Sequence, residues 1–275
     1  MPLTPLTIVD TIIAALLYPG LLTTLAVVSV YGLIMQGRAG LPAGFAAASS
    51  REGLATLSGV LLAGLGLALL PWPLHPVGGA GAWLWGWAAF ELAFLLPLLP
   101  AMLTGVPRLV RAASRTAQLG SLARALLWAA LSVALALYEH WTGLALVAHS
   151  LALVAALVSL PAAIGWGPFG TEERITPGGL TAGLPPAGQT LDTWASTARA
   201  GMLLTATLVA GLPVGVLPPA VSLLLVSGGL VLGAGLLRNF AGRLPRLTLP
   251  DALRFCLVWS ASLTLAANLV LAFAR

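Results

Sequence analysis

The segment AWLWGWAAFELAFLLPLLPAMLTGVPRLVRAASR, residues 82–115, decides the fold of this chain. From Ala82 to Thr104 it is apolar apart from one carboxylate, that of Glu91. A helix needs about 20 such residues to cross the hydrocarbon core of a bilayer. Three arginines follow directly, at Arg108, Arg111 and Arg115. The segment therefore predicts a membrane-spanning helix that ends in a basic connection.

The same alternation of an apolar run and a short break repeats along the whole chain. The runs cover residues 8–35, 54–71, 82–104, 118–138, 143–163, 197–213, 216–237 and 255–274. Of all residues, 59% are hydrophobic and 8% are charged, whereas about a quarter of a soluble domain is charged. We therefore predict an all-α, polytopic integral membrane protein with eight transmembrane helices and a single transmembrane domain over residues 1–275. The sequence has no internal repeat, so the inverted-repeat signature of many transporters is missing.

The arginines indicate how the chain is oriented. All thirteen basic residues are arginine, and twelve lie in or beside the first, third, fifth and seventh breaks. These are Arg38, Arg51, Arg108, Arg111, Arg115, Arg124, Arg174, Arg199, Arg238, Arg243, Arg246 and Arg254. Short arginine-rich loops stay in the cytoplasm. We therefore expect cytoplasmic odd-numbered breaks, two non-cytoplasmic termini and a location in the cell's inner (plasma) membrane.

The positive charge of the arginine loops also indicates which partners the chain can bind. Phospholipid headgroups are the nearest acidic groups to the arginine loops, and each juxtamembrane charge contributes about 1 kcal/mol to such an interaction. Binding of nucleic acid is excluded, because that needs a soluble domain whose basic face carries stacking aromatics.

The break after the fifth run is unusually long. We expect a cytoplasmic loop over residues 165–196, since loops of this length in compact proteins are usually functional. The loop has too few apolar residues to form its own core, so its order should come from the bundle and from a docked subunit. Around it, Arg38, Arg108 and Arg246 offer charge-assisted contacts to carboxylates of that subunit.

Few side chains are available for chemistry. Glu91 lies inside the third run, where an ionisable group costs at least about 2.5–3.5 kcal/mol, so it either functions there or hydrogen-bonds to a neighbouring helix. Glu139 follows Tyr138 between the fourth and fifth runs, where it either lies in a proton route or reaches the interface. The three histidines form no pair at matched depth, so haem is not expected. The single Cys256 excludes disulfides and thiolate metal sites.

Five segments, in order, resemble those of a known family. They are Gln36-Gly37-Arg38-Ala39-Gly40, Phe90-Glu91-Leu92, the run from Leu119 to Arg124, Pro168-Phe169 with Glu172-Glu173, and the run from Arg243 to Phe255. These segments are similar to conserved segments of the NuoH family. That family is the eight-helix membrane subunit of respiratory complex I that lines the quinone chamber, and it has relatives in membrane-bound energy-converting hydrogenases.

The resemblance implies roles for particular residues. In that family the Pro-Phe loop and the segment after the first helix surround the path of the quinone headgroup, and membrane carboxylates begin a proton route. The chain departs from the family at Tyr31–Met35, where the family has Glu-Arg-Lys, and at Gly170, where it has an aspartate. Matching Tyr138-Glu139 to the family's tyrosine–glutamate pair would shift the alignment away from Leu119–Arg124.

The resemblance implies a quinone-chamber and membrane-anchor subunit of a complex I-like, proton-translocating NADH–quinone oxidoreductase, with a peripheral iron–sulfur arm docked on it. The chain would be non-catalytic alone, with quinone as substrate, iron–sulfur clusters in partner subunits and no cofactor or metal of its own. Two alternatives stay open, an equivalent subunit of a membrane-bound hydrogenase without quinone and a standalone transporter. The implied site residues are Glu91 and Glu139 for a proton route, Arg38, Glu172, Glu173 and Arg174 for the quinone and partner loop, and Arg108, Arg246 and Asp251 for docking.

The arginine alternation makes the orientation testable. Cysteine-accessibility labelling of intact cells should modify a cysteine introduced at Ala80 and spare one introduced at Thr171, because the even-numbered breaks are expected outside. Labelling of Thr171 but not of Ala80 from outside would refute this orientation.

Overall fold

The structure is a computed structural model of the chain. It describes residues 13–14, 16–37, 45–75, 82–141, 143–170, 179–241 and 243–274. Several residues that carry sequence-based predictions lie outside these ranges, namely Arg38, Ala80, Thr171, Glu172, Glu173 and Arg174.

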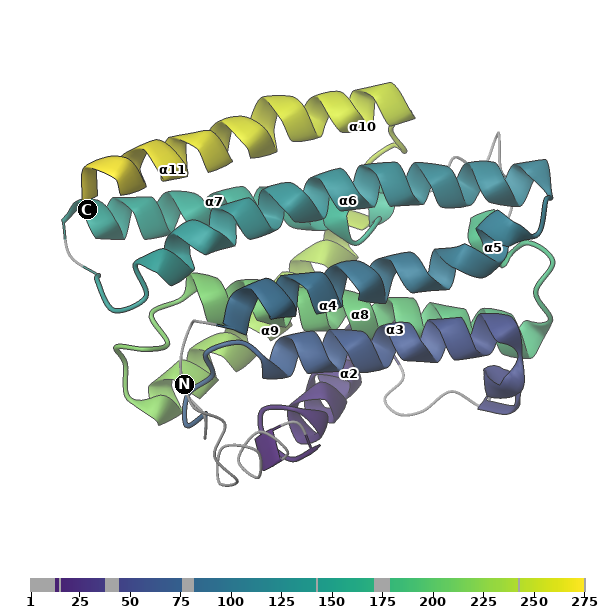
Figure 1. Ribbon diagram of the computed structural model, residues 1–275, viewed down its shortest axis with the longest axis horizontal. Helices are drawn as coiled ribbons and strands as arrows, with labels where there is room; N and C mark the ends of the chain where they lie inside the picture. Colours follow the sequence, from purple (N-terminus) through teal and green to yellow (C-terminus); the bar gives the residue numbers. More distant parts are fainter. Residues whose placement is uncertain are drawn as a thin grey trace.

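Within these ranges all regular secondary structure is helical, and every predicted apolar run contains a helix (Figure 1). The helices of the first four runs are α2 (Leu21–Gln36), α3 (Arg51–Ala68), α4 (Trp83–Leu95), which continues through η3 (Leu96–Leu98) into α5 (Leu99–Leu103), and α6 (Pro107–Ala136). The later helices are α7 (Leu144–Ala163), α8 (Pro186–Gly211), α9 (Pro219–Ala241), and α10 (Leu249–Phe255), which passes through the π-helix η6 (Cys256–Ala261) into α11 (Ser262–Ala274). The predicted all-α fold is confirmed.

Five of these helical segments are long and apolar enough to cross a bilayer, judged by length and composition. They are Trp83–Leu103, Pro107–Ala136, Leu144–Ala163, Pro219–Phe240 and Leu249–Phe273. Their outer surfaces carry exposed large apolar side chains, such as Leu232, Leu265 and Phe273, which only a lipid environment or another subunit covers favourably. The chain is therefore a multi-pass membrane protein.

Helix α8 is the central element of the bundle. Every residue from Ala198 to Gly211 is buried, and the helix packs against α2, α3, α7 and α9. Because protein surrounds it, α8 does not need a continuous apolar surface. Its two buried hydroxyls, those of Thr205 and Thr207, donate to helix carbonyls four residues earlier, at 2.8 and 2.9 Å. This internal position explains why the sixth apolar run is short.

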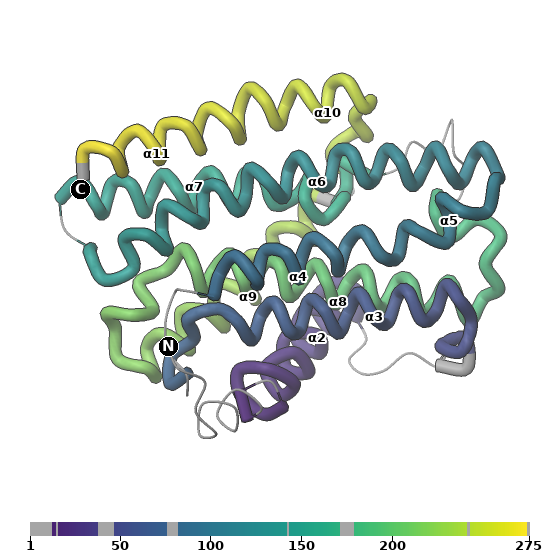
Figure 2. Tube along the Cα trace, in the orientation of Figure 1, coloured from purple at the N-terminus to yellow at the C-terminus, as the bar shows by residue number. Residues whose placement is uncertain are grey.

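The odd-numbered breaks of the chain meet at one end of the bundle, which we call the arginine-bearing end. Glu52, Thr116, Gly165 and Arg246, one from each of these breaks, line the same cavity. The even-numbered breaks meet at the other end, where the hydroxyls of Tyr18 and Tyr138 donate to the carbonyls of Pro73 and Pro71. The chain thus runs back and forth between two ends, as Figure 2 shows. The arginine alternation predicted this separation.

Two predicted boundaries differ from the structure. The first run was expected to form one helix from residue 8, but a turn over residues 17–20, which contains Pro19 and Gly20, separates the helical residues Ile13, Ala14 and Leu16 from α2, which begins at Leu21. The loop expected over 165–196 ends earlier, because α8 begins at Pro186. Proline suits the first turn of a helix, where its missing N–H has no partner to lose. Polar residues between Gln189 and Ser196 hid this first part of α8 in the sequence.

Helices α3 and α4 pack closely through glycines. A Cβ atom on Gly66 would lie 2.8 Å from the Phe90 ring and 3.0 Å from the Gly86 carbonyl oxygen. In a bilayer the hydrophobic effect contributes little to helix association, so close van der Waals packing through small residues takes its place. Phe90 itself is fully buried and lies against Trp128, with ring centroids 5.8 Å apart. The ring therefore has no room to move away from a larger residue at position 66.

This packing predicts that Gly66→Ala destabilises the chain by about 1–3 kcal/mol, the usual cost of an overpacked core. The measurement is thermal unfolding in mild detergent, followed by reaction of a thiol dye with the buried Cys256. Gly228→Ala is the matched control, because a Cβ atom there meets nothing within 4 Å. Equal unfolding temperatures for the two variants would show that the α3–α4 contact is not tight.

Candidate functional site

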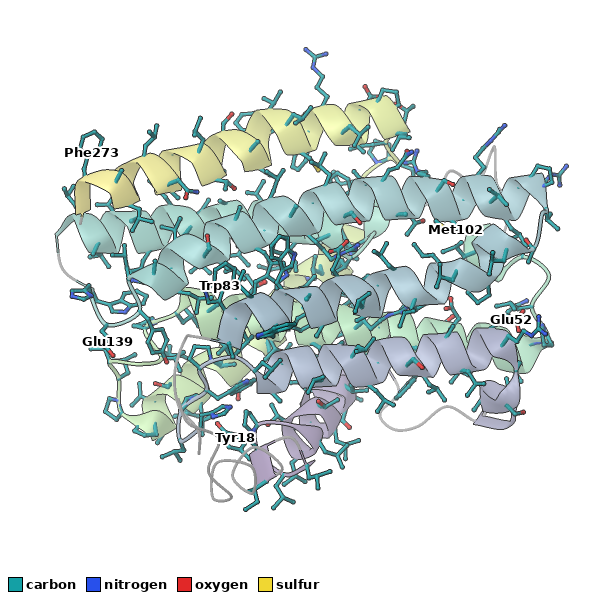
Figure 3. The ribbon with its side chains drawn as sticks, in the orientation of Figure 1. Tyr18, Glu52, Trp83, Met102, Glu139 and Phe273 are labelled. Carbon is teal, nitrogen blue, oxygen red and sulfur yellow. The ribbon has the colours of Figure 1, made fainter. Side chains whose placement is uncertain are left out.

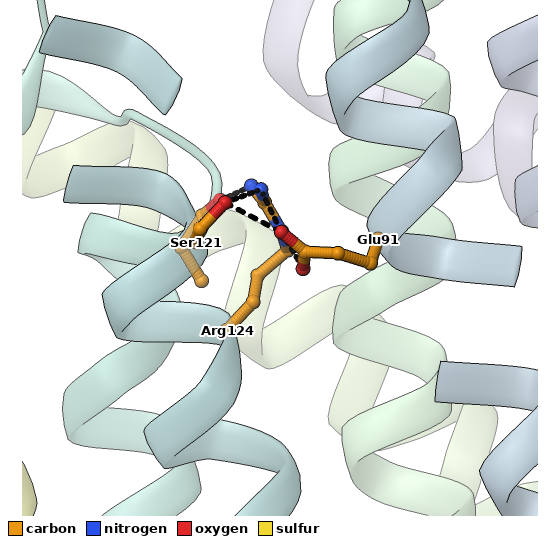
Figure 4. A network of polar contacts seen from close by, with 4 residues as sticks. Glu91, Ser121 and Arg124 are labelled. Carbon is orange, nitrogen blue, oxygen red and sulfur yellow. Dashed lines mark hydrogen bonds and ion pairs between the residues drawn. The ribbon is translucent and has the colours of Figure 1, made fainter. Parts of the chain in front are cut away.

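An ion pair lies inside the bundle between α4 and α6. The Arg124 Nε donates to Glu91 Oε2 at 2.7 Å, and the Arg124 Nη2 donates to Glu91 Oε1 at 2.9 Å. Ser121 donates to the same Oε1 at 2.6 Å (Figure 4). Ser121 and Arg124 are three residues apart on α6, a spacing that places both on one face of the helix.

The remaining contacts of Arg124 extend this network. Its Nη1 donates to the Ala163 carbonyl at the end of α7, at 3.2 Å. Its guanidinium lies 4.7 Å from the ring centroid of Phe94, one turn after Glu91 on α4. Only 3% of the Arg124 side chain and 24% of the Glu91 side chain is exposed. The pair therefore joins α4, α6 and α7 and compensates both charges away from water.

Glu91 thus points into the bundle and has two polar partners on α6. Of the two roles left open for Glu91, the hydrogen bond to a neighbouring helix is the one that the geometry shows directly. A role in a proton route stays a prediction.

A second buried arginine lies close to this pair. Arg199 of α8 is 6% exposed, and its guanidinium lies 5.7 Å from the centroid of the same Phe94 ring. Its Nη1 donates to the Ala93 carbonyl at 3.2 Å, and its Nε is enclosed without a partner among the described residues. The Asp192 carboxylate attracts Arg199, whereas the like charge of Arg124 repels it.

A cavity of about 620 Å³ opens at the arginine-bearing end, next to Arg199. Its exposed rim includes Glu52, Thr104 and Arg246, whereas Thr56 and Arg199 belong to its buried wall. Other lining residues include Phe94, Pro97, Leu98, Thr116, Ile164, Phe169, Leu180, Asp192 and Ser196. The lining therefore combines apolar side chains and two aromatic rings with a comparable share of polar surface, a mixture that can hold an amphipathic small molecule.

Arg115 holds the described part of the long loop against the bundle. Its Nη2 donates to the carbonyls of Leu247, at 2.8 Å, and Gly170, at 3.3 Å. The Leu247 N–H donates in turn to the Pro168 carbonyl at 2.8 Å, and the rings of Phe169 and Phe255 lie 5.2 Å apart. The expected contribution of the bundle to the order of this loop is thus present for residues 165–170. The contribution of a docked subunit stays a prediction.

The structure does not bring the two carboxylates of the predicted proton route together. Glu139 is exposed at the end of the bundle opposite the arginines (Figure 3), whereas Glu91 lies inside it. Beside Glu139, burial and then the Glu139 charge raise the pKa of the Tyr138 hydroxyl. The described residues hold no group of three or more histidine, cysteine, aspartate or glutamate side chains placed to bind a metal ion.

The residues predicted to dock a partner fall in different surroundings. Arg108 is exposed at the start of α6, and Arg246 borders the cavity. Asp251 lies in the first turn of α10, where its carboxylate accepts a hydrogen bond from the Thr248 hydroxyl at 2.6 Å, and Thr248 caps the helix by accepting from the Asp251 N–H. Arg199 was missed as a site residue, because it was counted only among the arginines that orient the chain. The signal that distinguishes it is its place inside the sixth apolar run, two helical turns after Asp192.

The buried pair predicts a clear stability effect. Glu91→Leu removes the countercharge of Arg124 and should destabilise the chain by about 3–5 kcal/mol, the usual result of breaking a buried ion pair. The double variant Glu91→Leu/Arg124→Leu should regain much of this loss, because no uncompensated charge remains. Thermal unfolding of the purified chain in detergent measures both. A double variant no more stable than Glu91→Leu would contradict the pairing.

Comparison with known proteins supports the fold. No protein-family model matches the sequence, and no curated protein matches it. Among solved structures, the chain is similar to a chain in the structure of the membrane-bound sulfane sulfur reductase (MBS), an archaeal respiratory membrane complex. The similarity covers 95% of this chain and 99% of that chain, with a TM-score of 0.59 and 16% sequence identity. Likeness at this level of identity shows that the two chains share a fold.

Proposed function

We propose that this chain is a membrane-anchor subunit of a complex I-like respiratory assembly and that its cavity at the arginine-bearing end is a quinone chamber. The observation that carries the proposal is the meeting of four arginine-bearing breaks around one amphipathic cavity. The fold shared with a chain of a respiratory membrane complex supports the assembly. The NuoH-like segments support the chamber.

The position of the cavity suits a membrane-soluble substrate. Its lining combines Phe94, Phe169 and Ile164 with the polar groups of Thr56, Asp192 and Arg199. A planar headgroup can pack against the aromatic and aliphatic side chains while its oxygens contact the polar ones. In this proposal the chain positions the quinone, and electrons arrive from iron–sulfur clusters in a partner subunit.

The partner would dock on the exposed arginines around the cavity mouth. Three arginines are exposed at this end, namely Arg108, Arg111 and Arg243. If the chain lies in the inner membrane of the cell, the positive-inside rule predicts that this end faces the cytoplasm. Arginine binds carboxylates in bidentate, charge-assisted pairs. A soluble subunit with an acidic face therefore fits this surface, while the apolar flanks of the bundle suit other membrane subunits and phospholipids.

A second candidate is the same anchor role in a complex that does not use quinone. The similar structure comes from a complex named as a sulfane sulfur reductase, which favours this alternative among those left open by the sequence. Under it, the cavity would serve proton transfer without a quinone headgroup, as in the relatives found in energy-converting hydrogenases. Quinone binding separates the two candidates.

Co-purification tests the assembly. Mild-detergent extraction of the tagged chain from native membranes should recover other membrane subunits and a soluble iron–sulfur subunit. The double variant Arg108→Glu/Arg111→Glu should lose the soluble subunit and keep the membrane subunits, because it reverses two charges on the proposed docking surface.

Glu139→Arg is the control, since it also reverses the charge of an exposed side chain but at the opposite end of the bundle. Recovery of the wild-type chain without any other subunit would overturn the proposed assembly. Equal loss of the soluble subunit in the control and in the double variant would overturn the docking surface.

A further inference from the structure

Arg199 is a cationic side chain in the interior whose hydrogen-bonding capacity is largely unused. A guanidinium carries five N–H donors, and among the described residues only the Arg199 Nη1 has a hydrogen bond, to Ala93. Arg199 is only 6% exposed, and it lines the cavity. Buried donors without partners are rare in folded proteins because each costs free energy. The arrangement points to an acceptor that reaches Arg199 through the cavity.

The surroundings of Arg199 hold the side chain in place. Gly59 of α3 has no side chain, and a Cβ atom there would lie 2.9 Å from the Arg199 Nη1. On the other side, Phe94 presents its ring to the guanidinium at 5.7 Å. Asp192 lies seven residues earlier on the same helix, which places it on the same face two turns away. Arg199 is thus positioned before any ligand binds.

The charges around the cavity indicate a neutral ligand. Among the described residues, the ionisable side chains of its lining are Glu52, Asp192, Arg199 and Arg246, two acids and two arginines whose formal charges sum to zero. A free anion would gain no net attraction from this set while losing its hydration. An uncharged ligand with an acceptor oxygen, in contrast, can accept a hydrogen bond from Arg199 at a smaller desolvation cost.

The shape of the lining adds a second requirement. Phe94 and Phe169 contribute aromatic faces, and Pro97, Leu98 and Ile164 contribute apolar ones. Such walls favour a flat, largely apolar ring over a flexible polar molecule. A ring with a carbonyl oxygen on its edge can pack against these side chains and accept a hydrogen bond from Arg199 at the same time.

We propose that Arg199 is the polar anchor of a site for the carbonyl oxygen of a neutral, planar, quinone-type headgroup in this cavity. The proposal rests on the proposed quinone chamber and deepens it, since it names the residue that binds the headgroup and the charge state of the ligand. Arg199 donates from its terminal guanidinium nitrogens, Phe94 supports the guanidinium, and Asp192 supplies the countercharge.

The test uses the complex purified from native membranes and a decyl-tailed benzoquinone as the probe. Quinone affinity is measured by isothermal titration for the wild type and for Arg199→Gln. Loss of a charge-assisted hydrogen bond should weaken binding about tenfold or more. Arg254→Gln is the control, because Arg254 is exposed and lies outside both the cavity and the proposed docking surface, and its affinity should stay unchanged.

A second measurement does not depend on the folding of the variant. A photoreactive benzoquinone is bound to the wild-type complex, and the modified residues are mapped by mass spectrometry. Labels on the cavity lining around Phe94 and Arg199 support the proposal, and labels confined to other regions overturn it. Competition with thiosulfate tests the charge state, and displacement of the benzoquinone by this anion would overturn the assignment of a neutral ligand.

The outcomes separate the two proposals. Equal quinone affinity of the wild type and Arg199→Gln overturns the role of Arg199 and leaves the chamber standing. Absence of quinone binding by the wild-type complex overturns both the chamber and the Arg199 site. If the Arg199→Gln complex does not assemble, the photolabelling and the competition still decide the proposal, because both use the wild-type complex.

Discussion

The bundle depends on the need to keep charge compensated where water is scarce. An uncompensated buried ion costs several kcal/mol, and the described part of this chain holds three buried arginines, Arg115, Arg124 and Arg199. Glu91 neutralises Arg124 through two hydrogen bonds and accepts a third from Ser121. This requirement determines which faces of α4 and α6 meet and which residue of α7 supplies its carbonyl. The packing of three helices therefore follows from one carboxylate.

The central helix shows how burial by protein differs from burial by lipid. A helix that faces lipid must be apolar over most of its surface, whereas α8 meets other helices on all sides over Ala198–Gly211. Threonines and an arginine are tolerated there because each finds a carbonyl or an aromatic ring. The same enclosure leaves space beside α8 at the arginine-bearing end, where the connecting segments separate and the cavity forms. The position of the cavity is thus a consequence of the topology.

Much of the fold could be predicted from the sequence, since both its signals, apolar runs and arginine alternation, depend on spacing along the chain. Helix ends were predicted less well at α2 and α8, because Pro19-Gly20 interrupts an apolar run and polar residues open α8. Glu91 could be recognised by its place within an apolar run. Its partner Arg124 could not, because a distance across thirty-three residues depends on how α4 and α6 pack. From the sequence, Arg199 could be interpreted only as one of the arginines that orient the chain, and its place in the wall of the cavity became visible only in the structure.

Arg124 and Arg199 also lie over one and the same aromatic ring, and this shared contact links the ion pair to the cavity. Phe94 lies under both guanidiniums, at 4.7 Å from Arg124 and 5.7 Å from Arg199. Two like charges at such short range repel each other, and each therefore needs its own compensation. Arg124 has it in full from Glu91, whereas Arg199 has only a carbonyl, the ring face and the more distant charge of Asp192. The arginine whose charge is less completely compensated is therefore Arg199, the one that lines the cavity. An acceptor that enters the cavity can reach this side chain.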